Sequence, residues 1–129
     1  MESMKYYLAA RFPRRAEMKK IAKRFSKALP GSECVARWVF GGEKGLNRQQ
    51  IAQLDLHDVK RADTLFIFTY PRGEPQPGGG RFVEMGYALA LNKRVIVIGD
   101  YENVFCHTPG VQVFRDLEQY LMHEAPMRA

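Results

Sequence analysis

The chain has few of the residues that mark disulfide-bonded or metal-binding proteins. Its 129 residues include two cysteines, Cys34 and Cys106, and three histidines. Neither set has the spacing of a zinc site, and two distant cysteines do not make a disulfide framework. We therefore expect reduced thiols and no bound metal.

Long hydrophobic runs are also missing. No apolar stretch approaches the roughly 20 residues that cross a bilayer, and residues 1–5 lead into a strand-like run without the layout of a signal peptide. We expect a cytoplasmic protein that does not enter membranes. A hydrophobic content of 46% is enough to form a core. The length predicts a single domain over residues 1–129, with residues 124–129 as a mobile tail.

The chain has an excess of positive charge, with a formal net charge of +6 and a pI near 9.5. Much of the excess lies on the polar side of one predicted helix, at Lys19, Lys20, Lys23, Arg24 and Lys27. Such a surface attracts anions and is usually a solvated face. Because no nucleic-acid recognition motif accompanies the charge, we do not expect nucleic acid as the partner, although a basic binding surface stays an alternative.

Hydrophobic periodicity predicts strands that alternate with helices. The predicted strands are 5–10, 34–39, 64–70, 94–99 and 111–114, and the predicted helices are 14–29, 48–62, 82–91 and 116–122. This alternation indicates an α/β fold, a flavodoxin-like (Rossmann-like) doubly wound sheet of about five mainly parallel strands with helices on both faces. Ligands of such sheets bind at the carboxyl ends of the strands.

One loop at that edge is rich in glycine. Gly78, Gly79 and Gly80 follow the strand 64–70 and lead into a helix that carries Glu84 near its start. The loop matches neither the P-loop nor the dinucleotide-binding pattern. Unpaired backbone N–H groups at a helix N-terminus can nevertheless hold an anion. We also expect the helix dipole to keep Glu84 ionised, as a nucleophile requires.

Several short segments then resemble the nucleoside 2-deoxyribosyltransferase superfamily, with a character closest to its 2'-deoxynucleoside 5'-monophosphate N-hydrolases. The resemblance covers residues 5–121. It is carried by Tyr7-Leu8-Ala9, Asp55-Leu56, Ala62-Asp63-Thr64-Leu65, Gly80-Arg81-Phe82-Val83-Glu84-Met85-Gly86-Tyr87-Ala88-Leu89 and Lys93-Arg94-Val95.

The resemblance implies a role for three of these residues. Glu84 would attack the anomeric carbon of the nucleoside, Tyr7 would orient Glu84, and Asp55 would handle the proton of the leaving base. The same chemistry occurs in retaining glycosidases, where a carboxylate meets the positive charge that develops on the sugar. The resemblance implies no cofactor.

The sequence departs from the family pattern six residues before the glutamate. Relatives have an aspartate or a serine there, and this chain has Gly78. The glycine favours a phosphorylated substrate, because backbone N–H groups of Gly78, Gly79 and Gly80, together with Arg81, could bind a 5'-phosphate. The N-hydrolases also have an arginine after the first strand, and Arg11, Arg14 and Arg15 all lie in that region.

The resemblance further implies self-association into a homodimer or larger oligomer. A side chain from the loop after the fourth strand of a neighbouring subunit would complete each pocket, and Asn103 and Thr108 are the candidates. Trp38, expected near the end of a strand, and Tyr70 are candidates for stacking on the base. We thus expect hydrolysis of a nucleotide N-glycosidic bond, with base exchange between nucleosides and a nucleotide-binding module without catalysis as alternatives.

Overall fold

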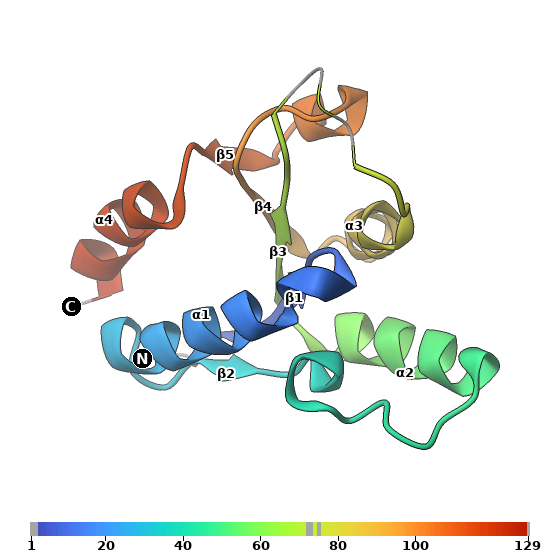
Figure 1. Ribbon diagram of the computed structural model, residues 1–129. Helices are drawn as coiled ribbons and strands as arrows, with labels where there is room; N and C mark the ends of the chain where they lie inside the picture. The colour runs from blue at the N-terminus through green and yellow to red at the C-terminus, as the bar shows by residue number, and fades with distance from the viewer. Residues whose placement is uncertain (1–2, 72–73, 75, 129) are drawn as a thin grey trace.

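The computed structural model contains one parallel sheet of five strands in the order β2-β1-β3-β4-β5 (Figure 1). It describes residues 3–71, 74 and 76–128, with side chains described as far as residue 124. The strands are β1 (Lys5–Ala9), β2 (Glu33–Cys34), β3 (Thr64–Phe68), β4 (Arg94–Ile98) and β5 (Gln112–Phe114). The flavodoxin-like α/β fold and its parallel sheet are therefore confirmed.

Helices cover both faces of the sheet. They are α1 (Arg15–Ala28), α2 (Arg48–Arg61), α3 (Gly80–Ala90) and α4 (Leu117–Arg128), with short 3-10 helices η1 (Phe12–Arg14), η2 (Arg37–Phe40) and η3 (Val104–His107). An aromatic cluster joins α1 and α4 to one face through Tyr6, Phe25, Phe66, Phe114 and Tyr120. The other face carries α2 and α3 (Figure 1). None of the helices among the described residues has the length and apolar character needed to cross a membrane.

The strand order fixes the position of the ligand site. β1 and β3 are central and pair in parallel, with Tyr7 beside Leu65. Every residue of β3 is buried, as expected for a strand covered on both faces. The chain leaves β1 toward one edge of the sheet and β3 toward the other, so a crevice opens where their carboxyl ends meet. The η1 segment and the loop before α3 border this crevice.

The predicted strand over residues 34–39 is wrong for most of its length. β2 ends at Cys34, and Trp38 lies in η2 rather than near a strand end. Side-chain hydrogen bonds hold this turn, because the Arg37 backbone N–H donates to the Asp58 carboxylate at 2.9 Å and the Trp38 indole N–H donates to the Leu8 carbonyl at 2.9 Å. Contacts from distant segments therefore override the β-branched and aromatic character of the run.

The start of α3 and the end of α4 also differ from the prediction. α3 begins at Gly80, two residues before the predicted start. α4 continues to Arg128, beyond the predicted end at residue 122. Glu124, which was expected to begin a mobile tail, is buried and accepts a hydrogen bond of 2.8 Å from Arg94. The rest of the predicted tail, including Ala129, lies beyond the described side chains.

Candidate active site

A cavity of about 240 Å³ lies where the carboxyl ends of β1 and β3 meet. Segments far apart in the sequence contribute to its wall, because the strand order brings them to one edge. Its lining includes charged and aromatic side chains. The charged residues are Glu43, Asp55, Arg81 and Glu84, and the aromatic residues are Phe12 and Trp38.

Tyr7 and Glu84 are joined by a hydrogen bond beside this cavity. Tyr7, on β1, is fully buried, and its hydroxyl donates to the Glu84 Oε2 atom at 2.5 Å. Glu84 borders the cavity from α3. The structure thus brings together the glutamate and the tyrosine that the sequence pointed to, and the contact fixes the orientation of the carboxylate.

Glu84 is not kept ionised by the helix dipole, so that expectation is wrong. The first turn of α3 holds no acidic residue, and Glu84 lies beyond it, where the effect of the dipole has fallen off. The pKa of Glu84 is raised to about 8, mainly by burial; the hydrogen bond from Tyr7 lowers it, and the nearby charge of Asp55 raises it. The buried position therefore favours the protonated form.

Asp55 borders the same cavity from α2. Its pKa is raised to about 6, first by burial and then by the charges of Asp58 and Glu43. Its Oδ1 atom is buried and has no hydrogen-bond partner. A carboxyl group with a pKa near neutrality can hold or release a proton during a reaction, which is what an acid/base residue requires.

Asp58, one turn further along α2, has a different role. It is fully buried and its carboxylate receives hydrogen bonds from the backbone and the guanidinium of Arg37, the latter at 2.7 Å. These bonds hold η2, and with it Trp38, against the sheet. The indole of Trp38 borders the cavity, whereas its N–H is already bonded to Leu8.

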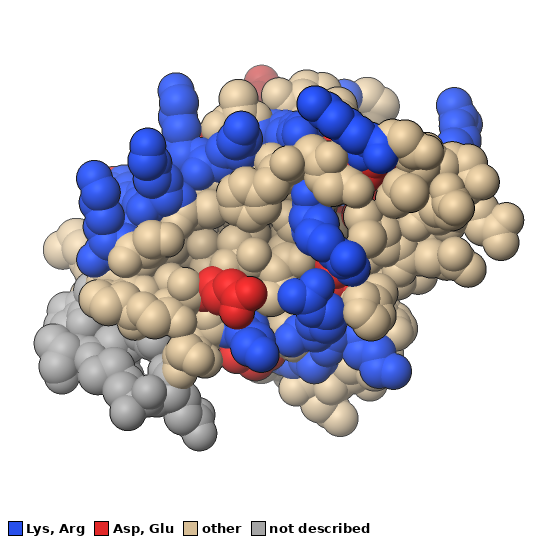
Figure 2. All heavy atoms as spheres, turned by 90° about the horizontal axis from the view of Figure 1, so that it is seen from below, with Lys and Arg blue, Asp and Glu red and all other residues tan. Residues whose placement is uncertain are grey.

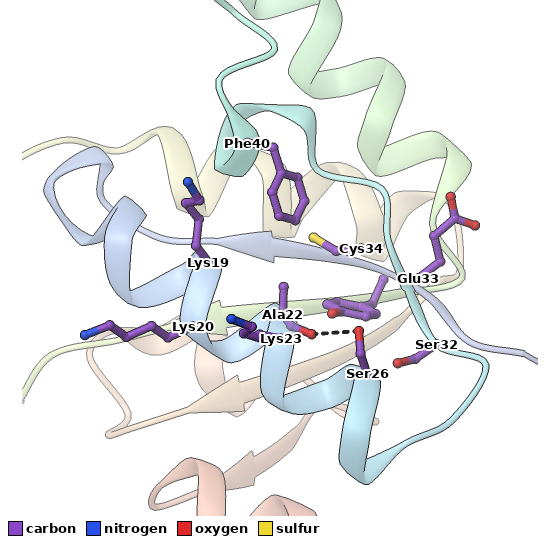
Figure 3. Close-up of a pocket in the computed structure, with 10 residues that line it drawn as sticks. Lys19, Lys20, Ala22, Lys23, Ser26, Ser32, Glu33, Cys34 and Phe40 are labelled. Carbon is purple, nitrogen blue, oxygen red and sulfur yellow. Dashed lines mark hydrogen bonds between the residues drawn. The ribbon is translucent and has the colours of Figure 1, made fainter.

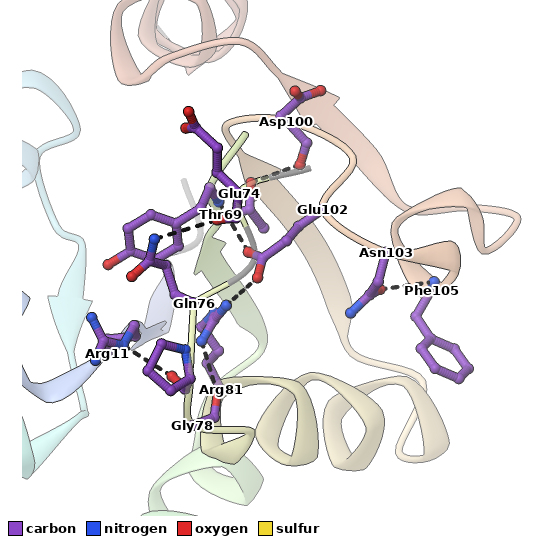
Figure 4. A network of polar contacts seen from close by, with 12 residues as sticks. Arg11, Thr69, Glu74, Gln76, Gly78, Arg81, Asp100, Glu102, Asn103 and Phe105 are labelled. Carbon is purple, nitrogen blue, oxygen red and sulfur yellow. Dashed lines mark hydrogen bonds and ion pairs between the residues drawn. The ribbon is translucent and has the colours of Figure 1, made fainter. Parts of the chain in front are cut away.

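A second cavity of about 310 Å³ adjoins the first and shares Ala10, Phe12, Gly80 and Arg81 with it. Arg11, Gly78 and Pro77 complete the part of its wall that faces the glycine loop. The Nε atom of Arg11 donates to the Pro77 carbonyl at 3.0 Å, which ties the β1 loop to the glycine loop (Figure 4).

The glycine loop ends in a free helix terminus. Gly79 is the N-cap of α3 and gives no side-chain cap, so the first N–H groups of the helix are available to a ligand. Gly78 has a φ of +88°, a conformation that side-chain-bearing residues rarely adopt. This backbone geometry accounts for a glycine at this position.

The Arg81 side chain is committed to a buried ion pair. Its guanidinium bonds to the Glu102 carboxylate and donates to the Gly78 carbonyl at 3.0 Å, and Glu102 also accepts from the Tyr70 backbone N–H at 3.0 Å (Figure 4). The Nε atom of Arg81 is buried without a partner. Sequence reasoning missed Glu102, whose only signal was an acidic side chain in the loop after the fourth strand.

Several of the predicted ligand-binding residues lie outside both cavities, among them Gly79, Arg14 and Tyr70. Arg14 pairs with Glu17 at 2.8 Å, and its guanidinium lies over the Tyr70 ring at 5.1 Å. Tyr70 also faces the guanidinium of Arg81 and borders neither cavity. The prediction that Tyr70 stacks on the base is therefore not supported by its position, because two cations occupy the surroundings of the ring.

The two loop residues expected to reach a neighbouring subunit make bonds within their own loop. The Asn103 side chain accepts from the Phe105 backbone N–H at 3.0 Å, and the Thr108 hydroxyl donates to the Phe105 carbonyl at 2.6 Å. Neither residue borders the two cavities of its own chain.

Glu43 and Phe12 border the site although sequence reasoning did not select them. Glu43 lies in the turn after η2, and Arg15 donates to its Oε1 atom at 3.3 Å. Its other carboxylate oxygen, Oε2, is buried without a partner. The available signal was an acidic residue between the glycines of a Gly-Gly-Glu-Lys-Gly turn, which also fits an ordinary surface loop.

Neither cysteine borders the two cavities. Burial raises the pKa of Cys34 to about 12, which suppresses the reactive thiolate. Among the residues that the structure describes, no group of three or more His, Cys, Asp or Glu side chains could hold a metal ion.

A larger hollow of about 560 Å³ lies between α1, β2 and η2, away from the catalytic candidates. Three lysines of α1 lie on one side of it, and Cys34 and Phe40 form other parts of its wall (Figure 3). Figure 2 shows that basic side chains are spread over the face seen from below, with few acidic ones among them. Its lining has one carboxyl group, that of Glu33, and no pair of carboxyl groups like that of Glu84 and Asp55, so size alone does not make it the reaction site.

Comparison with solved structures shows a likeness to CMP N-glycosidase BcmB from Clostridium botulinum, with a TM-score of 0.61. The sequences are 22% identical, and the match covers 92% of this chain and 96% of that chain. The two proteins share a fold. No protein-family model and no curated protein matches this sequence.

Proposed function

We propose that this chain is an N-glycosidase that hydrolyses the bond between base and sugar in a nucleoside 5'-monophosphate. The observation that carries the proposal is the grouping of Tyr7, Glu84 and Asp55 at a cavity that continues to the glycine loop. The likeness to a CMP N-glycosidase supports it at the level of the fold.

Glu84 is the nucleophile in this proposal. Its carboxylate attacks C1' of the sugar, an ester bond forms, and the bond from C1' to the base nitrogen breaks. Asp55, with a pKa of about 6, supplies a proton to the departing base. Water then attacks C1' and gives a proton back to Asp55, so that the sugar phosphate is released and Glu84 returns to its carboxylate form.

Tyr7 positions the nucleophile. Its own pKa is raised well above 10, mainly by burial and then by Glu84, so it remains a hydrogen-bond donor throughout the reaction. The donor holds one carboxylate oxygen and leaves the other for C1'. It also stabilises the glutamate anion during departure from the ester.

The second cavity is the site for the 5'-phosphate in this proposal. The free N–H groups at the start of α3, the loop at Gly78 and Gly80, and the cation of Arg11 all lie on its wall. Arg81 contributes through its unpaired Nε–H, because the rest of its guanidinium is bonded to Glu102 and Gly78. In this proposal the phosphate occupies the second cavity and the base the first, with the sugar between them.

Incubation of the purified protein with nucleoside monophosphates and with the matching nucleosides tests the proposal. We expect free base and sugar phosphate, with a preference for the phosphorylated substrates, and a Glu84→Gln variant without activity. Transfer of the sugar to an added second base would indicate base exchange instead. Thermal stabilisation by nucleotides without any release of base would indicate a nucleotide-binding module without catalysis.

We also propose that the chain associates with a second copy of itself through the exposed apolar residues Val83, Val104 and Phe105. These side chains are 63%, 71% and 61% exposed, and an exposed apolar group of this kind favours association. The last two lie in the loop that carries Asn103 and Thr108, and Phe105 points away from the chain in Figure 4. Sedimentation should show a dimer or larger oligomer, and Phe105→Asp should give monomers with weakened activity.

A further inference from the structure

Two buried oxygen atoms in the cavity near Glu84 have no hydrogen-bond partner. They are Oε2 of Glu43 and Oδ1 of Asp55, which reach the same cavity from different segments. A buried acceptor without a partner costs free energy. Such atoms in a native structure often mark the place of a ligand or water that donates to them.

The hydrogen bonds that Trp38 and Arg15 make leave these two oxygens without a donor. The indole N–H of Trp38 donates to the Leu8 carbonyl at 2.9 Å. The Nε atom of Arg15 donates to the Val39 carbonyl and its Nη1 atom to Glu43 Oε1, both at 3.3 Å. Arg15 therefore holds one oxygen of Glu43, and the other oxygen remains as an acceptor. A ligand at this end of the cavity can therefore donate hydrogen bonds to these oxygens.

Two aromatic rings also border the cavity. The rings of Phe12 and Trp38 have centroids 6.2 Å apart and are tilted by 37°. Flat apolar surfaces of this kind suit a planar base. The acceptors and the rings thus define a place for a base that donates hydrogen bonds from its edge.

We propose that Glu43 accepts a hydrogen bond from the exocyclic amino group of the nucleobase, so that the enzyme prefers amino-bearing bases over uracil and thymine. The inference rests on the proposed function for the position of the base. Cytosine has an amino group at position 4, where uracil has a carbonyl oxygen. An ionised carboxylate can only accept, so a uracil carbonyl at this place would face a second acceptor and leave both unpaired.

Matched nucleotide pairs test this inference, because CMP and UMP differ at position 4 of the base, as do dCMP and dUMP. We expect the wild-type protein to cleave the cytosine member with a kcat/KM at least about tenfold higher, the scale of one well-formed base contact. Glu43→Gln keeps the shape of the side chain but adds a donor that a uracil carbonyl can accept. The preference should fall or reverse in this variant. Glu33→Gln, an exposed glutamate on β2, is the matched control and should keep the wild-type ratio.

Binding measurements separate this inference from the proposed reaction. Calorimetry of CMP and UMP with the inactive Glu84→Gln variant, and with the same variant carrying Glu43→Gln, reports base preference without turnover. Equal affinity for CMP and UMP, or a ratio that Glu43→Gln leaves unchanged, would overturn the role of Glu43 whether or not base is released. If no nucleotide releases base but CMP binds better than UMP through Glu43, the glycosidase proposal fails and the base preference stands.

Discussion

Tyr7 and Glu84, 77 residues apart in the sequence, share a hydrogen bond of 2.5 Å between the hydroxyl and the Oε2 atom. β1 supplies one and α3 the other, and the fold brings them together because β1 and β3 are neighbours in the sheet. The contact links the centre of the sheet to Glu84, whose pKa is shifted more than that of Asp55, the other carboxyl group with a shifted pKa at the cavity. Tests of the mechanism therefore begin with this pair.

Tyr7→Phe removes the hydrogen bond and keeps the ring. Because the bond lowers the pKa of Glu84, the variant should raise that pKa above its present value of about 8. We expect kcat at pH 7 to fall about 10- to 100-fold, the scale of a hydrogen bond to a charged group. Steady-state kinetics across the pH range measure it, with Tyr101→Phe as an exposed control. Equal activity of Tyr7→Phe and wild type would remove Tyr7 from the mechanism.

The rate should depend on pH through the pair of Glu84 and Asp55. Their pKa values are about 8 and about 6, and the reaction needs one proton shared between them, with Glu84 ionised and Asp55 protonated. The singly protonated pair is most abundant between the two values. Its proton lies mostly on Glu84, and the active form, with the proton on Asp55, is a constant small fraction of the pair, so kcat/KM should form a bell with limbs near pH 6 and pH 8.

Asp55→Asn separates the two limbs. It removes a charge that raises the pKa of Glu84, so activity should be reduced but should rise with pH to a plateau that begins below pH 8. The alkaline decline should disappear, because no acid remains to be deprotonated. A bell with both limbs in their original positions would show that other groups control the rate.

The arrangement of the fold could be predicted from the sequence because its signals are local. In β4, residues 95–98 are apolar throughout, as a central parallel strand requires, and α1 has regular apolar spacing. The segment at Trp38 could not be predicted in this way. Its turn depends on Asp58, which is 21 residues from Arg37 and is held in place by the packing of α2.

Only those residues of the candidate site that match the family pattern could be predicted from the sequence. Tyr7, Asp55 and Glu84 are such positions. The raised pKa of Glu84 was not predictable, because it depends on burial and on the distance to Asp55 rather than on position along α3. The role of Glu43 was hidden for a similar reason, since a glutamate among glycines has no periodicity that indicates which way it faces.

Glu84 should also make the stability of the protein depend on pH. Its folded pKa of about 8 is above its ordinary value of 4.5, so the folded state binds this proton more tightly than the unfolded state. The stabilisation is fully present below pH 4.5 and is lost as the pH rises through about 8, by about 1.36 kcal/mol for each unit of pKa difference. The free energy of unfolding should therefore decrease over this range.

Glu84→Gln removes this titration. We expect the variant to gain stability relative to wild type as the pH rises from 5 to 9, by a few kcal/mol in total. Calorimetric melting at several pH values measures the difference, with Glu33→Gln as the control for loss of one carboxylate. A constant difference between Glu84→Gln and wild type would mean that Glu84 has an ordinary pKa in the folded protein.

The buried pair of Arg81 and Glu102 should contribute more to stability than the exposed pair of Arg24 and Glu118. The side chains of the first pair are 2% and 6% exposed, and those of the second are 47% and 61% exposed. Glu102→Gln leaves the Arg81 cation buried without its counter-charge, which typically costs about 3–5 kcal/mol. Glu118→Gln should change the melting temperature little, because solvent screens that pair. Urea unfolding of both variants measures the contrast, and equal losses in the two would show that Arg81 keeps its solvation in some other way.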